Sequence, residues 1–290
     1  MEKITCPQCN QPTSHYTDLA DHFLTQETFK LYTCNSCSFL FTYPVPEDLS
    51  PYYDSQDYLS HHTEKKNFIT LLYNKVRRIQ LNNKLKLLRS INAGDTLLDY
   101  GCGSGTFLKY CKQHGYQCTG LEPDADARRY ASESTGLSIY NDLSAIDSST
   151  RFDIITLWHV LEHVPKPSNL VSTLNKHLSG NGALIIAVPN FNSHDAKHYQ
   201  SYWAGYDVPR HLYHFSKSSI QIIANKNGMI VESIKPMIFD SFYVSLLSEK
   251  YRHKGILSYP AAFIEGITSN IKAFKTGEFS SLIYVLRKDA

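Results

Sequence analysis

The stretch LLDYGCGSGTFL, residues 97–108, constrains the fold more than any other part of the chain. It joins an apolar run to an amphipathic segment through Gly101, Gly103 and Gly105. Glycines permit a tight turn and let the backbone approach a ligand where a β-carbon would clash. A strand, a glycine-rich turn and a helix in immediate succession are typical of an open α/β sheet that binds a ligand at this turn.

Seven short apolar runs after Gly94 alternate with segments of helical periodicity. The runs read DTLLDY, YQCTGLE, LSIY, FDIITLW, GALIIAVP, MIVESIKPM and SSLIYVLR, and helices are expected near residues 106–114, 125–134, 168–178 and 217–226. Repeated β–α alternation implies a mainly parallel sheet with helices on both faces. The sequence therefore predicts an α/β fold with a doubly wound, seven-stranded Rossmann-like sheet.

At 290 residues, the chain can hold one sizeable α/β domain and a smaller module. Residues 1–46 are predicted to form the module, residues 47–91 a linker and a long helix from about residue 63, and residues 92–290 the sheet domain. Residues 240–279 form a long insert whose apolar side chains recur at helical spacing. We interpret this insert as a helical cap over the functional edge of the sheet, with a dimer surface as the alternative.

Two C-x-x-C knuckles lie in the N-terminal module. CPQC contributes Cys6 and Cys9, and CNSC contributes Cys34 and Cys37. Two such pairs separated by about two dozen residues match a four-cysteine site in which each knuckle gives two thiolates to a tetrahedral zinc ion. The sequence therefore predicts a zinc ribbon, with the zinc in a structural role.

The net charge of +2 gives the chain no strong electrostatic attraction for nucleic acid. One basic stretch, residues 65–89, has its charges spread along a helical pattern, which indicates a solvated helix face more than an RNA-binding surface. The N-terminus lacks the apolar core of a signal peptide, and no run of eighteen apolar residues occurs. We therefore expect a cytoplasmic protein without a transmembrane segment, and the sequence leaves its oligomeric state open.

The second expected strand ends in GLEPD, which places Glu122 at its tip. An acidic side chain there is positioned to accept both ribose hydroxyls of a bound nucleoside. A nicotinamide-dependent dehydrogenase uses similar geometry, so that class is an alternative. Two features count against it, because the glycines are spaced G-x-G-x-G and Asp99 lies two residues before the first of them.

Together, LLDYGCGSGTFL, GLEPD and FDIITLWHVLEHV resemble the motifs of class I S-adenosylmethionine-dependent methyltransferases, over roughly residues 90–240 and the final strand. The resemblance implies that Asp99 and the glycine turn face the methionine part of the cofactor and that Glu122 holds the ribose. It also implies that Asp142 lies near the adenine and that Trp158, at the end of the fourth strand, lines the cofactor site. The whole chain is similar to a bacterial subgroup that joins a zinc ribbon to a methyltransferase carrying YDVPRHLYHFS.

The segment WHVLEHV carries His159, Glu162 and His163 at the spacing i, i+3, i+4, which on a helical turn places all three on one face. The pair Glu162–His163 resembles the metal-binding pair of the ubiquinone-pathway O-methyltransferases and of the small-RNA 2′-O-methyltransferases. That resemblance implies that His159 takes the place of a first glutamate. It also implies that a later histidine, His211 or His214, completes the set.

Three uses of this cluster stay open. Imidazoles with one carboxylate favour Zn²⁺, Mn²⁺ or Fe²⁺ over Mg²⁺, and a metal there would lower the pKa of a substrate hydroxyl. Without a metal, a histidine could take the hydroxyl proton as a general base. The third alternative is structural, since an acidic residue complements the dipole of a helix that begins here.

The loop after the fifth strand, HDAKHYQSYWAGYDVPRHLYHFS, lies where doubly wound sheets bind their substrates. Arg210 is expected to clamp a carboxylate or phosphate, and Trp203 or Tyr206 to stack on a ring. The alternative for each aromatic residue is that it packs the loop onto the domain.

These observations predict a methyltransferase that moves the methyl group of S-adenosylmethionine to a small-molecule acceptor. The expected acceptor atom is an oxygen of a sugar, a polyol or a phenolic ring. Zinc would be structural, and a second divalent metal at the active site is an open question. Two alternatives are methylation of RNA gripped by the ribbon, and a cofactor-bound scaffold without catalysis.

Overall fold

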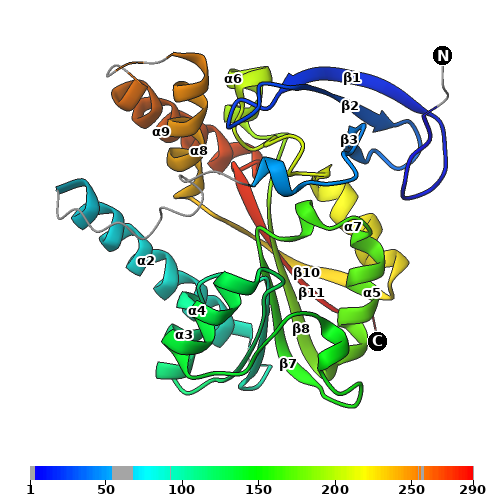
Figure 1. The fold of residues 1–290 in the computed structure, drawn as a ribbon, viewed down its shortest axis with the longest axis vertical. Coiled ribbons are helices and arrows are strands. Elements are labelled where there is room, and N and C mark those ends of the chain that lie inside the picture. The colour runs from blue at the N-terminus through cyan, green and yellow to red at the C-terminus, as the bar shows by residue number, and fades with distance from the viewer. Residues whose placement is uncertain (1–3, 54–67, 92, 254, 256–257, 290) are drawn as a thin grey trace.

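Seven strands form one sheet in the order β10-β11-β8-β7-β4-β5-β6, and Figure 1 labels four of them, β10, β11, β8 and β7. They are β4 (Thr96–Tyr100), β5 (Gln117–Leu121), β6 (Ile139–Tyr140), β7 (Phe152–Trp158), β8 (Leu178–Pro189), β10 (Met229–Pro236) and β11 (Ser281–Lys288). β11 runs antiparallel to both of its neighbours, and the other neighbouring strands are parallel. This computed structural model describes residues 4–53, 68–91, 93–253, 255 and 258–289. The predicted α/β fold with its seven-stranded sheet is confirmed.

Helices cover both faces of this sheet, as Figure 1 shows. α2 (Phe68–Ile91), α3 (Thr106–Gln113) and α4 (Ala125–Thr135) lie on one side, and α5 (Pro167–His177) and α7 (Lys217–Lys226) lie on the other. Successive strand residues point to opposite faces, so Ile154 of β7 is buried with Leu88 of α2, and Ile155 is buried with Val171 of α5. The start predicted for the long helix, near residue 63, lies outside the described residues.

The carboxyl ends of β4 and β7 lie where the strand order of the sheet reverses direction. These two strands are neighbours, but β5 continues the sheet on one side of the pair and β8 on the other. Connections that leave such a pair on opposite sides open a space at the strand ends, where α/β sheets bind ligands. The glycine turn follows β4, and the short helix η3 (Leu161–His163) follows β7.

A second, antiparallel sheet combines the N-terminal segment with a distant part of the chain. Its strands, in order, are β1 (Thr13–Ala20), β2 (Thr28–Cys34), β3 (Leu40–Tyr43) and β9 (Tyr213–His214). β9 belongs to the PRHLYHFS stretch, and its Tyr213 is paired with Phe41. One buried cluster joins Leu19 of β1 to Trp203 in the loop after β8. The N-terminal sheet and this loop therefore share a core, and the division of the chain at residue 46 stays a prediction.

The long insert after β10 is helical, as the sequence predicts. α8 (Asp240–Arg252) and α9 (Ser258–Thr276) pack against each other, and both contact α6 (His194–Tyr199) in the loop after β8. Residues 254, 256 and 257 of the insert and residues 54–62 of the predicted linker lie outside the described part of the chain. Of the helices that the structure describes, none is long and apolar enough to cross a bilayer.

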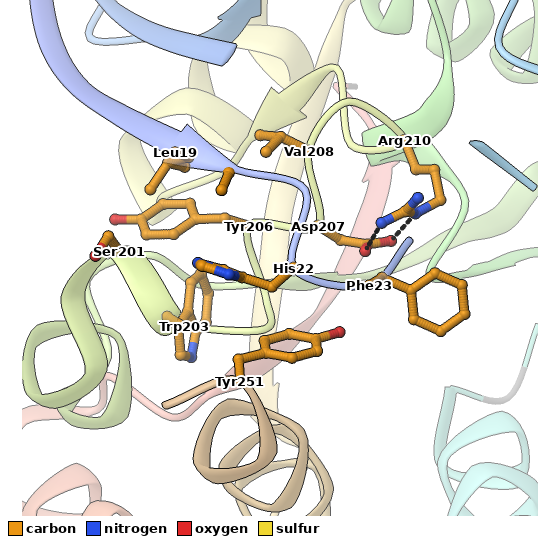
Figure 2. A pocket seen from close by; sticks show the side chains of 11 residues that line it. Leu19, His22, Phe23, Ser201, Trp203, Tyr206, Asp207, Val208, Arg210 and Tyr251 are labelled. Atoms are coloured by element: carbon orange, nitrogen blue, oxygen red, sulfur yellow. Dashed lines mark hydrogen bonds and ion pairs between the residues drawn. The ribbon is translucent and has the colours of Figure 1, made fainter. Parts of the chain in front are cut away.

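Arg210 joins the loop after β8 to the N-terminal segment through a buried network of charges. Its Nη2 donates to Asp21 Oδ1 and to Asp207 Oδ1, each at 2.7 Å, and its Nη1 donates to the carbonyl of Tyr52 at 2.9 Å. The side chains of Arg210 and Asp21 are 2% and 0% exposed. The ring of Phe23 lies 4.9 Å from the guanidinium carbon, beside the Asp207 pair (Figure 2). A buried, permanently charged group needs opposite charge, so these contacts fix the loop against the turn that follows β1.

We expect Asp21→Asn to lower the free energy of unfolding by about 3–5 kcal/mol, because it removes one of the two carboxylates from a buried guanidinium. Burial acts to raise the pKa of Asp21, but hydrogen bonds from Arg210 and Thr25 outweigh it and lower the pKa. The ionised carboxylate therefore contributes stability above about pH 4, and that contribution is lost as the pH falls through the lowered pKa. Urea denaturation at a series of pH values should show the difference between wild type and variant shrinking toward acid.

Asp18→Asn is the matched control. Asp18 lies in β1, just before Asp21 in the sequence. Its side chain is 54% exposed and forms an ion pair with His15. Surface substitutions of this kind change the free energy of unfolding by at most about 0.5 kcal/mol. Equal losses in the two variants would contradict the role assigned to the buried pair.

Candidate active site

The glycine turn between β4 and α3 has a left-handed backbone at each of its three glycines. The φ angles of Gly101, Gly103 and Gly105 are 73°, 51° and 70°, which favour glycine. A β-carbon at Gly101 would lie 2.6 Å from Val160 Cγ2, and one at Gly105 would lie 2.9 Å from Thr135 Cγ2. A β-carbon at Gly103 would meet no described atom within 4 Å. The turn therefore borders open space at Gly103, where a ligand can approach the backbone.

Glu122 closes this turn from the end of β5. Its Oε2 accepts a hydrogen bond from the backbone N–H of Gly103 at 2.8 Å, and its Oε1 accepts one from that of Asp124 at 3.0 Å. Each carboxylate oxygen keeps a further lone pair, and the side chain is only partly buried. The position and the remaining acceptor capacity of Glu122 fit the ribose hydroxyls that the sequence predicts there.

Asp142 lies on the surface, directly after β6, which is an edge strand of the seven-stranded sheet. Its carboxylate accepts a hydrogen bond from the backbone N–H of Ser144 at 2.7 Å and so caps the short helix η2 (Leu143–Ala145). This local role accounts for the aspartate without a ligand. Its contact with an adenine stays a prediction.

Asp99 is buried at the carboxyl end of β4. Thr156 of the neighbouring β7 donates to its Oδ1 at 2.6 Å. Burial raises the pKa of Asp99 to about 6, although Thr156 and the ammonium of Lys84 act in the opposite direction. Burial likewise lowers the pKa of Lys84 to about 8. Lys84 was not expected at this site, because the charges of the basic stretch indicated a solvated helix face.

Trp158, at the end of β7, lies beside the same lysine. The ammonium of Lys84 is 4.0 Å from the indole centroid, and the ring of Phe107 meets the indole edge to face at 5.5 Å. The indole Nε1 is buried and has no hydrogen-bond partner among the described residues. Buried indole N–H groups normally have a partner, so this donor is available to a ligand. With the open space at Gly103, it fits the S-adenosylmethionine site that the sequence predicts.

Glu162, His163 and His211 each bring one ligand atom within 4.8 Å of the others. Glu162 and His163 lie in η3, and His211 comes from the loop after β8. The Glu162 side chain is 1% exposed, and its Oε1 forms an ion pair with His159 Nδ1 at 3.4 Å, while neither oxygen has a hydrogen-bond partner within the described part of the chain. A buried carboxylate without hydrogen bonds is stable only near positive charge. Of the two histidines that the sequence left open, the structure brings His211 to this group.

Backbone carbonyls fix how the two imidazoles are presented. His163 Nδ1 lies 3.0 Å from the carbonyl oxygen of Arg210, and His211 Nδ1 lies 2.9 Å from that of Gly205. A carbonyl oxygen only accepts, so in each neutral ring Nδ1 carries the hydrogen and Nε2 keeps its lone pair. Metal-binding histidines are typically held in this way. Burial and the neighbouring His211 lower the pKa of His163 to about 4, so its ring is neutral at neutral pH.

His159 is not among the three residues whose ligand atoms converge, but it lies beside them through an ion pair with Glu162, and its part in catalysis stays a prediction. Its Nε2 lies 3.0 Å from Asp240 Oδ2, and its Nδ1 lies 3.4 Å from Glu162 Oε1. Burial acts to lower the pKa of His159, but the two carboxylates outweigh it and raise the pKa to about 10. A protonated ring has no lone pair for a metal. Asp240, the first residue of the cap, was missed because the insert carried no motif.

His214 is part of the N-terminal sheet, where its ring contacts Thr42 of β3. Its Nε2 lies 3.2 Å from Thr42 Oγ1, and the same hydroxyl donates to the carbonyl of His211 at 2.7 Å. The backbone N–H of Thr42 donates to the carbonyl of Leu212 at 3.0 Å. β3 therefore holds the segment that carries His211.

Arg210, Trp203 and Tyr206 do not face an open substrate site, which corrects the prediction made for them. Trp203 is 2% exposed and its Nε1 donates to Asp195 at 2.8 Å, while Tyr206 is 6% exposed and packs on the indole edge to face. Figure 2 shows these side chains around a cavity of about 10 Å³. Such a volume holds about one water molecule. The alternative interpretation, in which they pack the loop, agrees with these contacts.

A larger cavity, of about 390 Å³, lies between α2 and the segment that follows β10. Lys84, Lys86 and Lys235 line it together with Met237 and Phe239. Because Lys84 also contacts the indole at the end of β7, this cavity borders the group of residues described above. Its volume is in the range typical of small-molecule sites.

The cysteines of the two knuckles converge on one point. The Sγ atoms of Cys6 and Cys37 lie 3.6 Å apart, and Cys9 Sγ lies 3.5 Å from those of Cys34 and Cys37. The backbone N–H groups of Ser36 and Cys37 point at Cys34 Sγ, each at 3.4 Å. Four thiolates at these separations fit the tetrahedral coordination of a zinc ion.

Residues 73–234, more than half of the chain, match a family model described as a methyltransferase domain. The chain is 33% identical over 131 residues to the ubiquinone biosynthesis O-methyltransferase of Glaesserella parasuis serovar 5 (strain SH0165), which covers 41% of this chain and 54% of the relative. It is 31% identical over 108 residues to the protein of that name from Pseudomonas paraeruginosa (strain DSM 24068 / PA7). This alignment covers 34% of this chain and 47% of the relative. The chain thus spans about half the length of the curated relatives it matches.

Solved methyltransferase structures share this fold. The magnesium protoporphyrin IX methyltransferase of Synechocystis PCC 6803 aligns with a TM-score of 0.53 and 14% identity over 82% of this chain and 96% of its own. A segment of StiE O-MT aligns with a TM-score of 0.51 and 15% identity over 77% and 78%. The family match also counts against the nicotinamide alternative. By the extent of that match, the chain belongs to the methyltransferase domain family.

Proposed function

We propose that this methyltransferase O-methylates a small molecule whose acceptor hydroxyl binds a divalent cation held by Glu162, His163 and His211. The observation that carries the proposal is the convergence, at the carboxyl end of β7, of a buried carboxylate and two imidazoles whose Nδ1 atoms face backbone carbonyls. The name of the curated relatives, ubiquinone biosynthesis O-methyltransferase, supports oxygen as the acceptor atom.

The ligand set indicates which cation and which acceptor to expect. Two nitrogen ligands and one carboxylate suit Zn²⁺, Mn²⁺ or Fe²⁺ better than Mg²⁺. Three protein ligands leave coordination positions open for a substrate. A cation bound there would lower the pKa of the acceptor hydroxyl. Two hydroxyls on neighbouring carbons can chelate such a cation, so catechols and vicinal diols are the acceptor class that fits best.

S-adenosylmethionine supplies the methyl group: the acceptor oxygen forms a bond to the methyl carbon as the carbon–sulfur bond breaks, and S-adenosylhomocysteine and a proton are released. The residues of the chain hold the two reactants in line. Asp99, Glu122 and Trp158 hold the cofactor, and the Glu162 group holds the acceptor. The low pKa of His163 makes it a weak general base, which favours the ligand role for this ring.

We also propose that zinc bound by the two cysteine knuckles supports the active site from a distance. The zinc would fix the N-terminal sheet, because the small sheet shares its core with the loop after β8. Within that sheet, Thr42 bonds to the backbone of His211 and Leu212. The ribbon then acts as a support for a metal-binding histidine.

Glu122→Gln should weaken binding of S-adenosylhomocysteine by about tenfold or more, because the change removes the charge from a group that hydrogen-bonds the glycine turn and the ribose. Titration calorimetry measures the affinity. Asp126→Asn is the matched control, since Asp126 is an exposed carboxylate of α4 that pairs with Arg129. Equal affinities for Glu122→Gln and wild type would rule out the ribose contact.

His163→Ala should remove one bound Mn²⁺ from the full chain with S-adenosylhomocysteine and lower kcat by about 10²-fold or more, because it deletes a ligand beside the acceptor. Mn²⁺ binding is followed by calorimetry, and transfer is followed by mass spectrometry with catechols, vicinal diols and isolated phenols as acceptors. The chelating acceptors should react faster than isolated phenols.

His114→Ala is the control for this variant, because His114 lies exposed at the end of α3. It should leave both Mn²⁺ binding and transfer unchanged. If His163→Ala bound as much Mn²⁺ as wild type, the metal-binding part of the proposal would fail, whichever acceptor reacts.

Cys9→Ser should lose the zinc of the ribbon and lower kcat without changing the affinity for S-adenosylhomocysteine, because the ribbon supports His211 and not the glycine turn. Zinc content is measured by mass spectrometry alongside the transfer assay. Cys118→Ser is the control, because Cys118 lies in β5 and outside the two knuckles. This variant should keep the zinc of the ribbon. A zinc-free Cys9→Ser with full activity would show that the ribbon does not support the active site.

A further inference from the structure

A second group of metal-ligand side chains lies between α6 and the cap helix α9, apart from the residues considered so far. His194 and His198 are four residues apart on α6, and Glu265 faces them from α9. His194 Nε2 lies 3.2 Å from Glu265 Oε1, and His198 Nδ1 lies 3.7 Å from Glu265 Oε2. The three ligand atoms lie within 4.8 Å of one another.

The hydrogen bonding within this group is not satisfied. His194 Nε2 lies 3.2 Å from Glu265 Oε1 and also 3.2 Å from Nζ of Lys272. One ring nitrogen cannot both donate to a carboxylate and accept from an ammonium group. Glu265 is 11% exposed at its side chain, and its Oε1 has no hydrogen-bond partner among the described residues. A cation between Nε2 and Oε1 would engage both lone pairs.

Charges of both signs surround the group, since the ammonium groups of Lys272 and Lys197 also act on His194. Burial raises the pKa of Glu265 to about 7, and the neighbouring carboxylates of Asp195 and Glu249 act in the same direction. The positive charge of Lys272 opposes them.

We propose that His194, His198 and Glu265 form a binding site for Zn²⁺ or a similar divalent transition-metal ion. Two imidazoles and one carboxylate are the ligand types and number of a zinc site whose fourth position is open to water. The histidine side chains are 24% and 37% exposed, so the ion can enter from solvent. Lys272 is the competing charge, and its flexible exposed side chain turns aside when the ion binds.

The ion would join the cap to the loop that carries His211. α6 and α9 already meet through Asp195, whose Oδ1 accepts a hydrogen bond from Ser269 at 2.6 Å. The side chain of Asp195 is fully buried, so the backbone on both sides of the site is fixed before the ion arrives. Metal binding therefore stabilises the contact between cap and loop and does not create it.

The test is a calorimetric titration of the full chain with Zn²⁺, in wild type and in His198→Ala. His198→Ala should bind one equivalent fewer than wild type, and Zn²⁺ should raise the thermal midpoint of the variant by less. Lys272→Met removes the competing charge and should tighten binding about fivefold, as expected for one unit charge near the site in water.

Two further variants separate this site from the others. His15→Ala removes an exposed histidine that pairs with Asp18 on the N-terminal sheet and should bind as many equivalents as wild type. His163→Ala should keep the equivalent that His198→Ala loses, so failure of the Glu162 site and failure of this one are distinguishable. Equal stoichiometry in wild type and His198→Ala would overturn the proposal, whatever the affinity of Lys272→Met.

Discussion

The guanidinium of Arg210 is the contact on which the arrangement around the active site depends. It cannot lose its charge, so its burial requires carboxylates at fixed positions. Asp21 supplies one from the turn after β1, and Asp207 supplies the other from the same loop as the arginine. The carbonyl of Arg210 in turn faces His163 Nδ1 at 3.0 Å. One buried cation thus connects the N-terminal sheet to the orientation of an imidazole at the end of β7.

The segments outside the central sheet meet around that strand end. The N-terminal sheet holds the backbone of His211 through Thr42, and the cap contributes Asp240, which pairs with His159. In the function proposed above, the sheet and the glycine turn provide the cofactor side of the site. The acceptor side, in that same function, is built from three parts that are far apart in the sequence.

Much of this could be predicted from the sequence, because strand and helix periodicity and the glycine spacing are local patterns. The seven strands, the glycine turn, the cysteine knuckles and the helical insert are of this kind. The local sequence could not decide between His211 and His214 as the metal ligand. That choice depends on Thr42, a distant residue that contacts the ring of His214. For the same reason Arg210 looked like a substrate clamp, because its partner Asp21 lies 189 positions away. Lys84 was missed because helical periodicity does not show which basic side chain of a helix turns inward.

The charges near the glycine turn affect the relative affinities of the site for the cofactor and for its product. Burial raises the pKa of Asp99 to about 6 and lowers that of Lys84 to about 8, so neither charge is fully compensated by the other. A cationic ligand beside Asp99 lowers the pKa of that carboxyl and is attracted by it in return. S-adenosylmethionine carries a sulfonium charge that S-adenosylhomocysteine lacks. We therefore expect Asp99 to hold the cofactor more tightly than the product, which assists exchange after each transfer.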